Sequence, residues 1–137
     1  MIAISVDLGH ARTGLAVSDK SGFLASSLCV ITEYNDEKLI EKIAEKVEET
    51  KAEVIVVGLP RNMDGSEGES AHRARAIAEK LSERTGIRHV MQDERGTTIT
   101  AHAYLNTSNV YGKKRKHKVD AVAASIILQN YLDSQKG

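Results

Sequence analysis

The chain has 137 residues, 41% of them hydrophobic and 28% charged, a composition typical of one globular domain spanning residues 1–137. Nineteen basic and nineteen acidic residues balance, so overall charge indicates no particular partner. Aromatic residues are only 4%, which leaves few side chains for stacking on bases. A single cysteine excludes an internal disulfide framework. Without a signal-peptide pattern or membrane-spanning run, we expect a cytoplasmic protein with no membrane partner.

Three strands are predicted near the start of the chain, at residues 2–6, 14–18 and 23–31. The turn between the first two is too short for a crossover helix, so we expect them to pair antiparallel. An apolar stripe at helical spacing then predicts a helix over residues 36–50. Residues 53–58 contain the continuous apolar run Val54–Val57, typical of a strand buried in a parallel sheet.

A second helix is expected to follow, with Ser66 and Glu69 as a capping box and a buried stripe from Ala71 to Leu81. A short strand is predicted at residues 89–92. Thr97 or Thr98 is expected to cap a helix running to about Leu105. Residues 106–117 are predicted to be a loop, and residues 119–132 a buried helix. The order predicts an α/β fold with a mixed five-stranded sheet, three antiparallel strands then two parallel, and helices on both faces.

Four acidic residues lie at or beside predicted strand ends or at the start of the last helix: Asp7, Asp93, Glu94 and Asp120. Binding sites in parallel sheets form at the carboxyl ends of the strands, so these acids are expected to converge. Converging carboxylates repel one another and need a counter-charge, which Mg²⁺ or Mn²⁺ supplies. Such ions support phosphodiester hydrolysis.

Each acid also has a structural interpretation. Asp7 precedes Gly9 and fits a turn, whereas Asp93, Glu94 and Asp120 would each favour an adjoining helix N-terminus through its dipole. Their joint position at strand ends favours a site.

Two further features suit phosphate. Gly9, Arg12 and Gly14 lie in a strand-turn-strand segment where glycine permits positive φ and close approach of a phosphate to the backbone. The basic run at residues 113–118 would contact phosphates, or would simply be solvated. A similar glycine turn opens the lobes of sugar kinases and actin-like ATPases, but those proteins need two lobes to enclose ATP.

Four segments together resemble a known family. They are residues 7–19 (DLGHARTGLAVSD), 57–68 (VGLPRNMDGSEG), 93–98 (DERGTT) and 116–133, which contain KHKVDAVAA and ILQNYLD. The chain resembles the YqgF (RuvX) family of bacterial resolvase-like nucleases with a ribonuclease-H-like fold. The resemblance covers essentially the whole chain. Two departures are Gly96, where leucine is usual, and Ser27, where proline is common.

The resemblance implies a metal-dependent nuclease that processes the 5′ end of the precursor of 16S ribosomal RNA. The alternative within the family is a Holliday junction resolvase acting on branched DNA, which would work as a homodimer. The family's acids correspond to Asp7, Glu94 (with Asp93 beside it) and Asp120, the expected catalytic and metal-binding residues. Nucleic-acid contacts are expected from Gly9, Arg12, Arg95, Lys113, Lys114, Arg115 and Lys116.

Two other classes of function stay open from the residues alone. A non-catalytic nucleic-acid-binding module would keep the basic run and tolerate loss of the acids. An ATP-binding lobe would need a partner lobe and affinity for ATP. The nuclease interpretation leads because the carboxylates, their metal chemistry and the glycine turn agree.

Overall fold

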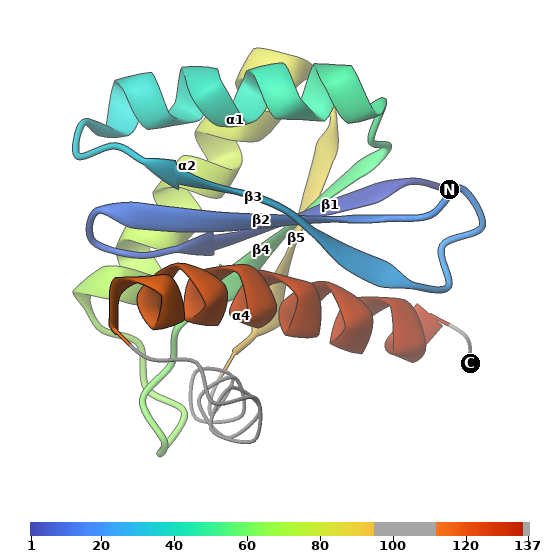
Figure 1. The fold of residues 1–137 in the computed structure, drawn as a ribbon. Helices are drawn as coiled ribbons and strands as arrows, with labels where there is room; N and C mark the ends of the chain where they lie inside the picture. Colours follow the sequence, from blue (N-terminus) through green and yellow to red (C-terminus); the bar gives the residue numbers. More distant parts are fainter. Residues whose placement is uncertain (95–111, 136–137) are drawn as a thin grey trace.

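The computed structural model describes residues 1–94 and 112–135, with side chains described for 1–94 and 121–135. In these residues one mixed sheet has the spatial order β3-β2-β1-β4-β5 (Figure 1). The strands are β1 (Ala3–Leu8), β2 (Arg12–Ser18), β3 (Ala25–Thr32), β4 (Val54–Leu59) and β5 (Arg88–Asp93). Antiparallel pairing joins β1 to β2 and β2 to β3, whereas β1 pairs parallel with β4 and β4 with β5. The predicted mixed sheet is confirmed.

The lengths of the connections explain the change from antiparallel to parallel pairing. Residues 9–11 alone separate β1 from β2, so the chain must reverse direction. Helix α1 (Asp36–Thr50) lies between β3 and β4, and α2 (Glu69–Thr85) lies between β4 and β5. Each helix carries the chain back across the sheet, so that the next strand starts at the same end as β1.

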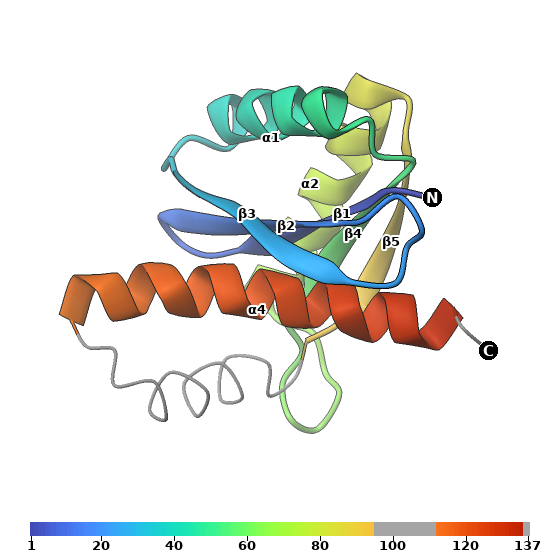
Figure 2. The same ribbon diagram turned by 45° about the vertical axis from the view of Figure 1, so that its right-hand side comes forward.

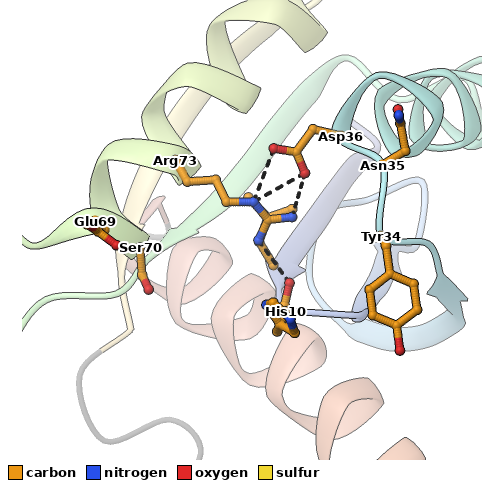
Figure 3. A pocket seen from close by; sticks show the side chains of 9 residues that line it. His10, Tyr34, Asn35, Asp36, Glu69, Ser70 and Arg73 are labelled. Atoms are coloured by element: carbon orange, nitrogen blue, oxygen red, sulfur yellow. Dashed lines mark hydrogen bonds and ion pairs between the residues drawn. The ribbon is translucent and has the colours of Figure 1, made fainter.

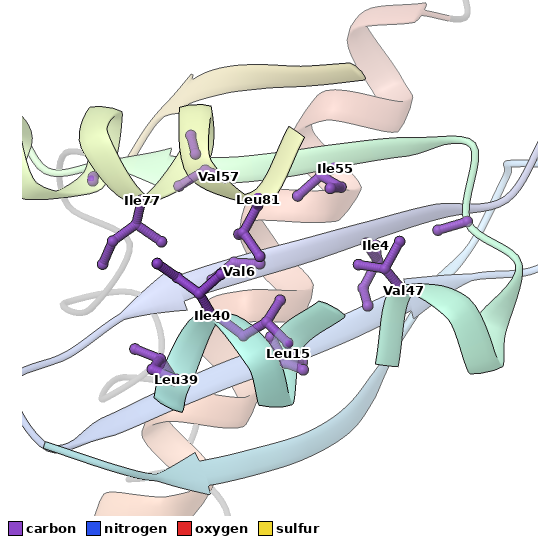
Figure 4. Close-up of a cluster of buried hydrophobic side chains, with 14 residues drawn as sticks. Ile4, Val6, Leu15, Leu39, Ile40, Val47, Ile55, Val57, Ile77 and Leu81 are labelled. Atoms are coloured by element: carbon purple, nitrogen blue, oxygen red, sulfur yellow. The ribbon is translucent and has the colours of Figure 1, made fainter. Parts of the chain in front are cut away.

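The helices lie on both faces of the sheet, as predicted. Figures 1 and 2 show α1 and α2 over one face and α4 (Gly112–Gln135) across the other. Strand side chains alternate between the two layers. The α1 and α2 layer (Figure 4) includes Ile4, Val6, Leu15, Leu39, Ile43, Ile55, Val57, Ile77 and Leu81. The α4 layer includes Ala3, Ala16, Val54, Val56, Ala124, Ile127, Leu128, Tyr131 and Leu132.

Serine hydroxyls buried in the sheet add hydrogen bonds to these apolar layers. Ser5 Oγ donates to the carbonyl oxygen of Ala124 in α4 at 2.7 Å, and Ser18 Oγ accepts from the backbone N–H of Ala3 at 2.8 Å. The first of these bonds joins the central strand directly to the helix across it. No helix in the described parts of the chain is long and apolar enough to cross a membrane.

Two local predictions were wrong. The final helix begins at Gly112 rather than near Val119, because the Lys and Arg residues assigned to a loop are good helix formers. Helix α2 has Gly68 as its N-cap, with no side-chain cap. Ser66 is held instead by Asp64 Oδ1, which accepts from its hydroxyl at 2.6 Å and from its backbone N–H at 2.9 Å. The helix predicted from Thr97 or Thr98 to Leu105 lies outside the described residues.

Candidate active site

Asp7 lies next to the carboxyl end of β1 and faces α4. Side chains alternate along a strand, and Ser5, two residues earlier, bonds to the α4 backbone. Asp7 is paired in register with Gly14 of β2, so the position directly opposite it on the antiparallel side of the sheet carries no side chain.

Glu94 follows β5 directly and is fixed by the neighbouring strand. Its backbone N–H donates to the carbonyl oxygen of Leu59 at 3.2 Å. Its side chain lies over Gly58 of β4, since a Cβ built on that glycine would be only 2.6 Å from Glu94 Oε2. The same Cβ would be 2.8 Å from Cδ1 of Ile127, a residue of the α4 layer. Glycine at position 58 thus provides the room that the Glu94 carboxylate occupies.

Asp7 and Glu94 meet through a hydrogen bond between their side chains. Burial has the largest effect on Glu94, followed by the charge of Asp7, this hydrogen bond and the charge of Asp93. Together they raise the pKa of Glu94 from its ordinary 4.5 to about 9. Two carboxylates in such contact cannot both be charged without a counter-charge, so the pair retains a proton at neutral pH.

Asp93 and Glu94 are adjacent in sequence but lie in different surroundings. Val90 packs in the α4 layer and Met91 packs against the opposite one, so the alternation places Glu94 on the side of Val90 and Asp93 on the side of Met91. Asp93 Oδ2 is 3.9 Å from an Nη atom of Arg61. The structure therefore brings Glu94 to Asp7 and brings Asp93 to an arginine.

The glycine turn after β1 does not use the positive φ that glycine permits. The positive-φ glycines of the described residues are Gly22, Gly65 and Gly86, and neither Gly9 nor Gly14 is among them. Gly9 is required by a close contact instead, because a Cβ there would overlap the carbonyl oxygen of Arg12. Arg12 itself begins β2 and is partly buried.

A cavity of about 740 Å³ lies behind this turn, on the side of α1 and α2 (Figure 3). The Arg73 guanidinium crosses it, donating to Asp36 at 2.9 Å and to the Gly9 carbonyl oxygen at 2.9 Å. The lining residues are Leu8, Gly9, His10, Tyr34, Asn35, Asp36, Glu69, Ser70 and Arg73. The acid pair is not among them, since Asp7 faces α4. The cavity and the acid pair therefore lie on opposite sides of the turn.

The other predicted site residues are placed only in part. Asp120 belongs to α4, four residues before Ala124; its backbone is described, but its side chain is not. The same holds for Lys113, Lys114, Arg115 and Lys116, whose backbone forms the first turns of α4. Arg95 lies wholly outside the described residues.

Gly58 and Arg61 were not predicted as site residues. Both lie in the segment 57–68 that carries the family resemblance, and the glycine is the residue before the last in an otherwise apolar strand. That glycine was a usable signal, because a glycine inside a strand often marks a close approach. The position of Arg61 beside Asp93 depends on how the loop after β4 folds back, which no sequence pattern revealed.

The acid pair fits a hard divalent cation. Its donors are carboxylate oxygens, and the charge of Asp7 is among the causes that raise the pKa of Glu94, a repulsion that a cation would offset. Among the residues whose side chains are described, no group of three His, Cys, Asp or Glu is placed to hold a metal. Magnesium is commonly held by only one or two carboxylates, with water and substrate phosphate completing the shell. Two carboxylates are thus enough to begin such a site.

Known proteins resemble this chain over nearly its whole length. Residues 1–134 match the family model described as "RuvX: Holliday junction resolvase". Proteins of Nitrosospira multiformis and Clostridium beijerinckii, each named "Putative pre-16S rRNA nuclease", are 38% and 41% identical over 133 residues. Those alignments cover 97% of this chain and 88% and 96% of the two relatives.

Solved structures share the fold. Thermus thermophilus RuvC in complex with a Holliday junction substrate matches with a TM-score of 0.65 at 15% identity, over 100% of this chain and 96% of that chain. The Fowlpox virus resolvase in complex with Holliday junction DNA matches with a TM-score of 0.61 at 12% identity, over 100% of both chains. At these identities the similarity establishes the fold, which is the predicted ribonuclease-H-like arrangement.

Because Glu94 retains a proton at neutral pH, we expect it to lower the free energy of unfolding by an amount that depends on pH. Because the pKa of Glu94 is raised in the folded protein, the free energy of unfolding should fall as pH rises from about 4.5 towards about 9. Glu94→Gln cannot ionise, so it should melt higher than the natural protein at pH 8 in EDTA and lose this advantage near pH 4.5. Each kcal/mol relieved is worth roughly 2–8 °C in a domain of this size. Parallel melting curves across this pH range would contradict the prediction; Glu83→Gln, exposed on α2, is the control.

Gly58→Ala should displace the Glu94 carboxylate without unfolding the protein. The atoms that the new methyl group meets, Glu94 Oε2 and Ile127 Cδ1, are ends of flexible side chains and can move. As the carboxylate moves towards solvent, the pKa of Glu94 should fall towards 4.5, which ¹³C NMR titration of the carboxyl measures. Gly68→Ala is the control, since its methyl group meets nothing within 4 Å. A Glu94 titration unchanged by Gly58→Ala would show that the glycine does not make this room.

Proposed function

Because the chain belongs to the RuvX family, we propose that it is a nuclease that hydrolyses phosphodiester bonds in nucleic acid at Asp7 and Glu94. The observation that carries the proposal is the contact between these two carboxylates at the carboxyl ends of β1 and β5. Paired acids at that edge of an α/β sheet match the place where such folds build their sites. A module that only bound nucleic acid would have no need of this electrostatically unfavourable pair.

The proposed substrate is the precursor of 16S ribosomal RNA, cut at its 5′ end in ribosome biogenesis. Relatives at 38% and 41% identity, aligned over nearly their whole length, carry a name with this substrate. Branched DNA is the alternative, favoured by the family description and by the two structural neighbours that hold Holliday junctions. The RNA substrate leads because those neighbours are only 15% and 12% identical, a level that supports the fold alone.

The residues of the chain would share the chemistry as follows. Asp7 and Glu94 would lose their shared proton and hold Mg²⁺ or Mn²⁺ through carboxylate oxygens. Asp120 would supply a further carboxylate; in sequence it precedes Ala124, Ile127 and Tyr131 by four, seven and eleven residues, the spacing of the helix stripe that packs on the sheet. Such ions, when bound, activate water and stabilise the leaving oxygen of a phosphodiester. Asp93 stays outside this set and balances Arg61.

The start of α4 supports a nucleic-acid path beside these acids. Lys113, Lys114, Arg115 and Lys116 lie in the first turns of the helix, where positive charge opposes the helix dipole. A phosphate bound there would offset this unfavourable arrangement. The backbone around Gly9, with Arg12 and Arg95, would contact further phosphates on the strand.

Asp7→Asn should abolish cleavage and leave the fold intact. The amide keeps the shape of the side chain but removes a metal-binding charge, so the rate should fall roughly a thousandfold. Asp133→Asn, at an exposed position near the end of α4, should cleave normally. Activity of the Asp7 variant within about threefold of the natural protein would rule out the catalytic assignment.

One assay tests both the substrate and the metal. The natural protein is incubated with a precursor 16S RNA fragment or a four-way DNA junction, in Mg²⁺, Mn²⁺ or EDTA. We expect cleavage of the RNA that stops in EDTA and returns with either ion. Preferential, symmetric cutting of the junction would favour the resolvase alternative, provided that light scattering shows the protein to be a dimer. Full cleavage in EDTA would contradict a metal-dependent reaction.

The basic residues at the start of α4 should set the salt dependence of binding. Changing Lys113, Lys114, Arg115 and Lys116 to Ala should weaken binding to both nucleic acids. It should also flatten the plot of log affinity against log salt by roughly two to four units, since each neutralised phosphate contributes about 0.7–0.9. The control variant changes four lysines of α1 and its C-cap to Ala, on the other face of the sheet: Lys38, Lys42, Lys46 and Lys51. Equal effects of the two variants would mean that net charge, not this surface, governs binding.

A further inference from the structure

Arg61 lies in a loop after β4 that is closed on itself. An isolated bridge pairs Arg61 with Glu67, and the backbone N–H of Asn62 donates to the Ser66 carbonyl oxygen at 2.9 Å. The Asn62 side chain also donates to Ser66 Oγ at 2.9 Å. Gly65 allows the tight reversal, with φ of +91°. The loop therefore holds the base of the Arg61 side chain in a defined place.

The Arg61 guanidinium is positioned by two carboxylates but closely bonded to neither. Its Nη atoms are 3.9 Å from Asp93 Oδ2 and 3.5 Å from Glu67 Oε2. Charge-assisted hydrogen bonds are typically about 2.7–2.9 Å long, so both contacts are loose. Glu67 is already engaged by Arg75, which donates to it at 2.8 and 2.9 Å. Within the described residues, Arg61 Nε is buried and has no hydrogen-bond partner.

Other arginines in the described residues show what a structural arginine looks like here. Arg73, Arg75 and Arg84 each donate two or more hydrogen bonds to one carboxylate, at Asp36, Glu67 and Glu41. Arg61 has carboxylates nearby and makes no such bond. The Arg61 side chain is 34% exposed, but its Nε–H is buried and unused, and a buried donor left in this way calls for an explanation. A ligand that reaches the exposed part of the guanidinium and completes its bonds is the explanation that its location favours.

That location is beside the acid pair. Asp93, the loose partner of Arg61, directly precedes Glu94, and its charge contributes to the electrostatics of that residue. Because Asp93 and Glu94 face different sides of the sheet, Arg61 is next to the pair and outside it. A strand whose phosphate entered the pair would carry its neighbouring phosphate past this edge of the sheet.

We propose that Arg61 binds a backbone phosphate of the nucleic acid that flanks the one held at Asp7 and Glu94. This inference rests on the proposed nuclease function and adds a binding residue to it. The planar guanidinium can donate two parallel hydrogen bonds to phosphate oxygens, which the two loose carboxylate contacts leave available. Asp93 and Glu67 then serve to orient the empty guanidinium towards the strand.

The first test uses the natural protein and inorganic phosphate, so it does not depend on cleavage. The Nε–H resonance of Arg61 is identified in ¹H–¹⁵N spectra by its loss in Arg61→Lys. On titration with phosphate it should shift and saturate, whereas the Nε–H of Arg84, which donates to Glu41 of α1, should not. The proposal is overturned if phosphate does not shift the Arg61 resonance, or shifts it no more than the Arg84 resonance. A shift in a protein that cuts neither RNA nor junction would uphold phosphate binding and reject the nuclease function.

The second test measures binding of the precursor RNA fragment and the four-way junction by fluorescence anisotropy at several salt concentrations. Arg61→Gln should weaken binding about tenfold and reduce the salt slope by about 0.7–0.9, the loss of one phosphate contact. Arg61→Lys should keep the slope but recover only part of the affinity, because an ammonium group cannot make the bidentate hydrogen bonds of a guanidinium. Arg84→Gln, with the same charge change, should bind normally. If Arg61→Gln binds like Arg84→Gln while the natural protein cleaves, Arg61 only tethers the loop and the proposal fails.

Discussion

The close approach of α4 to the central strand is the constraint on which the rest of the structure depends. Small residues on both surfaces allow it: Ala3 and Ser5 on β1, Ala16 on β2, Gly58 on β4, and Ala123 and Ala124 on the helix. The hydrogen bond from Ser5 to the Ala124 carbonyl fixes the helix against β1 two residues before Asp7. One contact therefore sets the position of the helix relative to the strand that carries the first acid, and places Asp120 one turn earlier along the helix.

The acid pair is expected to lower the stability of the fold at neutral pH, because burial and the charge of Asp7 raise the pKa of Glu94. A neutral residue at position 94 would avoid this cost in the same space. Such local conflicts between stability and sequence are typical of functional sites. The surrounding core is otherwise consistent, with apolar side chains on both layers and serine hydroxyls satisfied by backbone partners.

Much of the fold followed from the sequence, because it rests on local periodicity and connection length. The turn at residues 9–11 required an antiparallel pair, and the apolar run at 53–58 indicated a strand covered on both faces. Other features depended on tertiary arrangement. Asp93 and Glu94 could not be separated without the register of β5, and the role of Gly9 depends on where the Arg12 carbonyl lies. The α4 start was missed because a basic run suits both a solvated loop and a helix.

The parallel register of β5 against β4 has a consequence beyond pairing. Leu59 lies opposite Asp93 and Gly58 opposite Gln92, and this alignment alone decides which acid turns towards α4. A slip of one residue would exchange the two carboxylates between the faces of the sheet. The edge would then keep the same composition and the same net charge, yet Asp93 would lie over the glycine and Glu94 beside the arginine. The length of the connection at Gly86 and Ile87, at the far end of the strand, therefore helps to set which acid faces α4 about six residues later. That length is under the same constraint as the acids themselves.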